Sequence, residues 1–131
     1  MIKIKYAITL IILISLVFSG CEKPMIGEPG SCRIGSSYKV NWDLSFTIDS
    51  IHEYRCPIPL MCAIAGDVDL YINFKRPFKS INKVLSLNNH DRNPVEIGDY
   101  TFRLLEVEPY PELHVEVDPK DYKIKMLIMK D

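Results

Sequence analysis

The 131-residue chain lacks most of the patterns by which enzymes and nucleic-acid-binding proteins are identified. It contains no Gly-rich phosphate loop and no Gly-x-Ser-x-Gly nucleophile turn, and it has only three histidines. Sixteen lysines and arginines stand against 17 aspartates and glutamates, so the charge balance gives no case for a nucleic-acid partner. No segment shows a sustained apolar stripe at helical spacing. These absences argue against a helix bundle and against a recognisable catalytic set.

The chain also lacks an apolar run long enough to cross a membrane as a helix. The longest run covers residues 6–18, which as a helix would span about 20 Å at about 1.5 Å per residue, against a hydrocarbon core of about 30 Å. Lys3 and Lys5 precede it, and small residues follow it at Ser19-Gly20. A basic start, an apolar stretch and a small-residue end are typical of a secretory signal, so we predict that residues 1–20 are removed.

Ser19-Gly20-Cys21 resembles the bacterial lipobox, in which small residues precede a cysteine that receives a diacylglyceryl thioether. The resemblance implies cleavage before Cys21 and acylation of the new amine, and two or three acyl chains hold a protein stably on a membrane. Phe18 stands where leucine is usual in this motif. Glu22 occupies the place where aspartate resembles an inner-membrane retention signal, which favours the outer membrane. The alternative is an ordinary secreted protein cleaved nearby.

The mature chain is expected to be one domain on a short tether. Loss of residues 1–20 removes Lys3 and Lys5 but no acid, so 16 basic residues become 14 against 17 acidic ones, a net charge of −3. This balance gives no electrostatic case for an anionic bilayer. Residues 21–36 hold two prolines and several glycines and are predicted to be a lipidated tether whose later part adds an edge strand. Residues 37–131 are predicted to form the domain.

Apolar residues in the predicted domain alternate with polar ones, as in a strand with one buried face. Residues 38–48 are predicted to form one strand, with a β-bulge near Asp49-Ser50. Further strands are expected over residues 68–74, 84–87, 100–107, 115–117 and 122–128, separated by turn residues. The pattern predicts an all-β fold, a single antiparallel β-sandwich of immunoglobulin-like type, with a small β-barrel as the alternative.

Three cysteines remain besides Cys21, in a compartment that favours disulfides. Cys56 and Cys62 close a short, proline-containing loop, and we predict that they pair. Cys32 is then a buried free thiol or a competitor for one of the other two.

Few residues suggest metal binding or catalysis. Cys56, Cys62 and His52 lack the tight spacing of structural zinc sites. Asp67 and Asp69 point to one face of a strand and, with Asp43 or Asp99, could supply oxygens to calcium, but a solvated polar face explains them more simply. A further alternative is a small hydrolase with Cys32 and His52 as nucleophile and base, although no local motif supports it. We predict no metal site, no catalytic residue and no cofactor.

The run Arg55-Cys56-Pro57, then Cys62 and Gly66, resembles a motif of uncharacterised bacterial lipoproteins in which a strand leads into a short cysteine-bounded loop and another strand follows. Tyr100 to Pro111 and Asp121-Tyr122 match more loosely. Glu53-Tyr54 and Ile64 depart from the pattern. The resemblance implies a β-rich domain and no particular activity.

The candidate binding residues are Arg55, Pro57 and Pro59, because a disulfide-bounded, proline-stiffened loop can present a rigid element to a partner. The loop could also insert into a protease cleft as an inhibitor, or merely join two strands with Arg55 paired locally. Tyr54 and Tyr110 could form a platform for glycans. We therefore expect a non-enzymatic envelope lipoprotein, held on the membrane by its lipid, whose protein partner the sequence does not identify.

Overall fold

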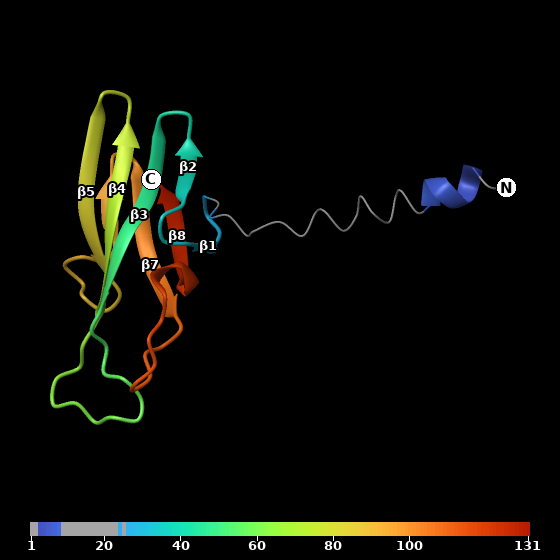
Figure 1. Cartoon of the computed structure of the whole chain (residues 1–131). Helices are drawn as coiled ribbons and strands as arrows, with labels where there is room; N and C mark the ends of the chain where they lie inside the picture. Colours follow the sequence, from blue (N-terminus) through green and yellow to red (C-terminus); the bar gives the residue numbers. More distant parts are fainter. Residues whose placement is uncertain (1–2, 9–23, 25) are drawn as a thin grey trace.

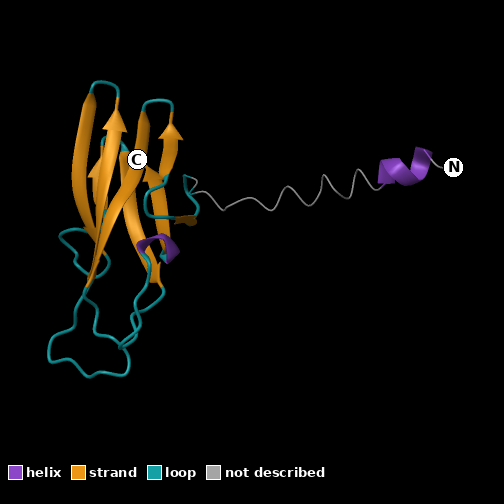
Figure 2. Ribbon diagram, in the orientation of Figure 1, coloured by secondary structure: helices purple, strands orange, loops and turns teal. Residues whose placement is uncertain are grey.

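A computed structural model describes residues 3–8, Pro24 and residues 26–131. Residues 3–8 are helical. The rest forms two antiparallel four-stranded sheets packed face to face (Figure 1, Figure 2), and no closed barrel forms among these residues. The predicted β-sandwich is confirmed.

The first sheet has the strand order β2-β3-β4-β5. Its strands are β2 (Ser37–Asn41), β3 (Leu44–Glu53), β4 (Val68–Arg76) and β5 (Lys79–Ser86). The second sheet has the order β1-β8-β7-β6. Its strands are β1 (Gly30–Cys32), β8 (Lys123–Lys130), β7 (Tyr100–Glu108) and β6 (Val95–Ile97), and a 3₁₀ turn (Pro119–Asp121) precedes β8. The first sheet is a simple meander, whereas immunoglobulin domains use Greek-key connections.

Inward-facing apolar side chains of the two sheets form one core. Phe102 of β7 lies 4.8 Å from Phe74 of β4 and 5.5 Å from Phe46 of β3, between ring centroids. All three rings are fully buried. Because Phe102 belongs to the second sheet and the other two belong to the first, this aromatic cluster joins the layers.

The structure corrects the predicted strand over residues 38–48. Asn41 pairs with Leu44 across a two-residue turn, so Trp42-Asp43 is a hairpin tip and Trp42 is 85% exposed. Directly paired residues of a hairpin face the same side, as Tyr38 and Phe46 do. A two-residue turn alone would break the apolar alternation, but a register shift between Lys39 and Asn41 restores it, so the sequence pattern does not reveal the turn.

The remaining strand predictions are mostly confirmed. The bulge lies where it was expected, with a register shift between Ile48 and Ser50. β1 is the predicted edge strand, paired with β8. Ile26 also bridges Ile128, so the folded domain begins before residue 37, the predicted boundary. The strand predicted at residues 115–117 is wrong, since residues 109–118 form an irregular connection.

The two ends of the sandwich differ. The β2–β3 and β4–β5 hairpin turns lie at one end, and the long connection from β3 to β4 lies at the other (Figure 1). That connection, residues 54–67, contains both paired cysteines, and we call it the disulfide loop.

Candidate functional site

The disulfide loop closes at a narrow neck. The backbone N–H of Tyr54 donates to the carbonyl of Asp67 at 3.0 Å. Cys56 and Cys62 form the predicted disulfide, with their Cα atoms 5.9 Å apart. The bond shortens the free part of the loop to the five residues between the cysteines, which lowers the number of conformations open to it.

Gly66 permits this neck to close. A Cβ atom at residue 66 would lie 1.6 Å from the carbonyl oxygen of Tyr54, far inside contact distance. The obstructing atom belongs to the backbone, so a side-chain rotation cannot relieve the clash. Gly66 is therefore required by close chain approach, which gives a physical reason for the glycine in the cysteine motif.

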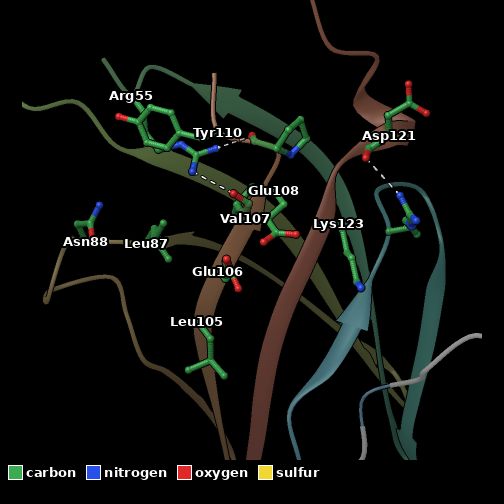
Figure 3. A pocket seen from close by; sticks show the side chains of 12 residues that line it. Arg55, Leu87, Asn88, Leu105, Glu106, Val107, Glu108, Tyr110, Asp121 and Lys123 are labelled. Atoms are coloured by element: carbon green, nitrogen blue, oxygen red, sulfur yellow. Dashed lines mark hydrogen bonds between the residues drawn. The ribbon is translucent and has the colours of Figure 1, made fainter. Parts of the chain in front are cut away.

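Arg55 is the second residue of the disulfide loop, and its guanidinium is hydrogen-bonded to the other sheet (Figure 3). Its buried guanidinium forms a two-point ion pair with Glu53. It also donates to the carbonyls of Val107, at 3.0 Å, and Pro109, at 3.2 Å. Four guanidinium contacts are thus made within the protein. Arg55, a candidate binding residue from the sequence, is placed to position the loop rather than to reach a partner.

Tyr110 completes this anchor. Its ring lies 4.9 Å from the guanidinium carbon of Arg55, in cation–π contact. Its hydroxyl donates to the carbonyl of Cys56 at 2.8 Å. From the sequence, Tyr110 was expected only as part of a glycan platform, and Glu53 was only a departure from the lipoprotein motif. Opposite charges two residues apart on a strand, as at Glu53 and Arg55, were the available signal.

A second attachment holds the loop beyond the disulfide. The N–H of Ile58 donates to the carbonyl of Pro111 at 3.0 Å, and the N–H of Leu113 donates to the carbonyl of Ile58 at 2.9 Å. The loop is therefore fixed by its neck, by the Arg55 anchor and by this bridge.

Between these attachments the loop exposes apolar side chains. Met61 is 99% exposed and Ile64 is 84% exposed, while Ile58 and Leu60 are each about half exposed. Pro59 is exposed and Pro57 is half-buried. A backbone fixed at three places thus presents several apolar side chains to solvent, which is an arrangement that marks interaction surfaces.

A groove of about 700 Å³ runs along β7 beside the anchor. Arg55 and Tyr110 lie at one end, and Glu106, Glu108 and Lys123 line the middle (Figure 3). Glu108 raises the pKa of Glu106, chiefly through a shared hydrogen bond and its negative charge. The groove has both signs of charge and no nucleophile beside a base, so its chemistry suits polar contacts with a partner surface.

The two aspartates considered for calcium have other roles. Asp67 and Asp69 are buried, which corrects the simpler interpretation of a solvated face. Asp67 accepts from the N–H groups of Val68 and Asn88 at 2.8 and 3.1 Å. Asp69 accepts from the hydroxyl of Ser86 and lies 4.0 Å from Arg92. The loop that follows β5 covers both carboxylates, which sequence alternation could not show.

Ser86, which the sequence did not suggest, lies near two residues weighed for catalysis, His52 and Asp69. His52, Asp69 and Ser86 are paired in one row across β3, β4 and β5, but the aspartate lies between the other two. A catalytic triad needs the histidine in that place. Cys32 is fully buried, and burial raises the pKa of its thiol to about 12, so it is a protonated core residue rather than a nucleophile.

Within the described part of the chain, no group of three or more histidine, cysteine, aspartate or glutamate residues could hold a metal ion. Cys56 and Cys62, considered for zinc, are joined to each other. Cys21, the predicted lipidation site, lies outside the described residues. Residues 3–8, Pro24 and 26–131 include no helix of the length and apolar character needed to cross a membrane. No protein-family model matches the chain, and neither a curated protein nor a solved structure shows significant similarity to it.

Proposed function

We propose that this chain is a lipid-anchored protein of the bacterial envelope, and that its sandwich is a non-enzymatic binding module which contacts a protein partner through the disulfide loop. One observation carries the proposal: a loop fixed at three places exposes Met61 and Ile64 almost completely. Exposed apolar side chains cost solubility and are usually kept where they are needed.

The rigidity of the loop supports binding. Association must offset the entropy lost when a flexible segment becomes ordered, and a segment already ordered avoids much of that cost. Met61 and Ile64 supply apolar area, and methionine adapts its shape to a partner. Arg55 supports this surface from below, through its contacts with Glu53 and Tyr110.

The lipid anchor is supported by the sequence. Residues 1–20 have the three parts of a secretory signal, and Ser19-Gly20-Cys21 resembles a lipobox. The cysteine motif around Arg55 resembles that of bacterial lipoproteins. Glu22 favours the outer membrane over the inner one.

A protease cleft is a second candidate partner. Met61 is almost fully exposed and lies directly before Cys62, the second disulfide cysteine, so its side chain projects from a constrained loop and can enter a specificity pocket. The buried Arg55 is not available for that role, so an inhibitory loop would suit proteases that prefer an apolar residue. Titration of such a protease with the purified chain tests this directly, because a substrate would be cleaved and an inhibitor would abolish activity.

Site-specific photo-crosslinking in living cells tests the main proposal. A benzophenone amino acid at Leu60 should give an adduct of one discrete mass, while the same group at exposed Lys83 on β5 should not. Met61→Ser with Ile64→Ser should abolish the adduct. An adduct that survives these changes, or its absence at Leu60, would contradict the binding role. Mass spectrometry of the amino-terminal peptide tests the anchor separately, since Cys21 should carry acyl chains.

A further inference from the structure

Two aromatic side chains protrude from the end of the sandwich opposite the disulfide loop. Trp42 lies in the β2–β3 turn and Phe78 in the β4–β5 turn, and the two turns lie at the same end of the molecule (Figure 1). Trp42 is 85% exposed and Phe78 is fully exposed. Aromatic rings in such positions are typical of residues that lie at the boundary between lipid and water.

The two hairpins of this hairpin end, residues 37–45 and 73–82, are basic, whereas Asp99 and Asp131 adjoin them from the other sheet. The charged side chains of the two hairpins are those of Lys39, Lys75, Arg76, Lys79 and Asp43. Four positive charges against one negative charge give +3, in a mature chain whose overall charge is −3. A hollow of about 340 Å³ between the two hairpins is lined by Lys39, Trp42, Lys75 and Arg76, among others. The overall charge therefore conceals a local surface that complements anionic headgroups.

The start of the folded domain lies nearer this end than the other. Ile26 bridges Ile128, two residues before Lys130, which is paired with Tyr100. At about 3.4 Å per residue along β8, Ile128 lies about 7 Å from Lys130. The hydroxyl of Tyr100 accepts a hydrogen bond from the Asn41 side chain at 2.6 Å, directly before Trp42. The entry point of the chain is thus close to the level of the β2–β3 turn.

The sequence between Cys21 and Ile26 limits how far the domain can stand from its lipid. Five residue steps span at most about 18 Å even when fully extended. In the opposite direction from Ile128, β8 runs back to Lys123, about 17 Å at the same rise, and the disulfide loop lies beyond that point (Figure 1). The lipid attachment can therefore bring the hairpin end to a membrane more readily than the loop.

We propose that Trp42, Phe78 and the surrounding lysines and arginine contact the anionic headgroups of the bilayer that holds Cys21. The disulfide loop then faces away from the membrane, where a partner can reach it. This inference rests on the lipid anchor proposed above. It assigns a second, membrane-facing surface to the domain and fixes the orientation in which the binding loop is presented.

The single tryptophan of the chain makes the test direct, because all tryptophan emission comes from Trp42. The full-length protein, processed in cells and purified from membranes, would be reconstituted into vesicles with and without phosphatidylglycerol. Emission should shift to shorter wavelength and should be quenched by lipids brominated along the acyl chain. Both effects should be larger with the anionic lipid. Solvent-like, unquenched emission would overturn the inference.

Two variants serve as matched controls. Trp42→Phe with Met61→Trp moves the reporter to the disulfide loop, where emission should be unquenched; equal quenching at both ends would overturn the proposed orientation. Lys75→Glu with Lys79→Glu should remove the preference for anionic lipid, and an unchanged preference would overturn the role of these charges.

The lipid anchor on Cys21 and the membrane contact of Trp42 are tested by separate measurements. Mass spectrometry of the same sample reports acyl chains on Cys21. A lipidated protein with unquenched Trp42 would overturn the membrane contact and leave the anchor intact. If Cys21 is unmodified, the anchor is overturned, and the same vesicles titrated into the soluble protein decide the contact: quenching supports it, and no quenching overturns it as well.

Discussion

Glu53 and Arg55 form a two-point ion pair where β3 ends and the disulfide loop begins. The carboxylate oxygens of Glu53 lie 2.8 Å from Nε and 2.6 Å from Nη2 of Arg55. Both side chains are largely buried, with 16% and 7% of their surface exposed. Since Arg55 also binds the carbonyls of Val107 and Pro109, the pair links the two sheets at the base of the loop.

Arg55→Ala should lower the free energy of unfolding by about 3–5 kcal/mol, because it leaves a buried carboxylate without its partner. Arg55→Lys should recover little, since a single ammonium group cannot reproduce the fork that meets Glu53 and two carbonyls. Urea unfolding followed by circular dichroism measures both. Arg103→Ala, at an exposed position on β7, is the control and should change stability by less than about 0.5 kcal/mol. Equal losses at the two arginines would contradict the role of Arg55 in joining the disulfide loop to the second sheet.

Gly66→Ala should be costly despite the small size of the change. The added methyl group would meet the Tyr54 carbonyl at 1.6 Å, so the neck must open, at an expected cost of about 3 kcal/mol. Thermal unfolding provides the measurement, and hydrogen exchange at the Tyr54 amide should accelerate as its bond to Asp67 is lost. Ala65→Ser, next to it at an exposed position, should leave both unchanged. Normal protection of Tyr54 in the Gly66 variant would refute this account.

Removal of the disulfide should destabilise the domain moderately without unfolding it. Cys56→Ser with Cys62→Ser opens a loop of six-residue separation, for which the chain-entropy model expects about 2 kcal/mol. The Arg55 anchor and the Ile58 bridge remain, so the far-ultraviolet spectrum should be preserved. The crosslink from Leu60 should weaken, because the exposed segment becomes less ordered. A crosslink of full yield would show that loop rigidity is irrelevant to binding.

Cys32 should resist thiol reagents in the folded protein and react only on unfolding. Burial raises the pKa of this thiol to about 12, whereas the unfolded thiol titrates at about 8.5. A group whose pKa is raised on folding contributes stability that is lost as pH rises, so unfolding should become easier between about pH 9 and pH 12. Cys32→Val should reduce this alkaline loss. Rapid native-state labelling at neutral pH would contradict the buried position.

Glu106→Gln should raise stability at neutral pH. Glu108 raises the pKa of Glu106 in the folded state, so stability falls as pH increases through that raised pKa and the two carboxylates come to repel each other. The amide removes the repulsion. Melting temperatures should therefore differ at pH 7 and converge at about pH 3, where the Glu106 carboxyl is protonated. Glu116→Gln, exposed in the 109–118 connection, should show no such difference. A pH-independent gain at Glu106 would indicate a cause other than charge.

The amino-acid sequence by itself determined the fold class, most of the strands and the disulfide. Period-two alternation reports which face of a strand is buried, and this information is local. It also located the bulge at residues 49–50, because a bulge shifts the apolar parity at one point. The Cys56–Cys62 bond followed from chain proximity, which is again a property of the sequence.

Only the tertiary structure decided what depends on contacts between distant segments. The hairpin turn at Trp42 was hidden because a register shift between Lys39 and Asn41 restores the alternation that a two-residue turn would break. The burial of Asp67 and Asp69 depends on a loop about 20 residues later in the chain. Arg55 was predicted from the sequence as a candidate binding residue. Its observed role depends on the carbonyls of Val107 and Pro109, which only the packing of the sheets brings to it. The basic hairpin end arises in the same way, since two turns more than 30 residues apart combine charges that the overall balance of the chain conceals.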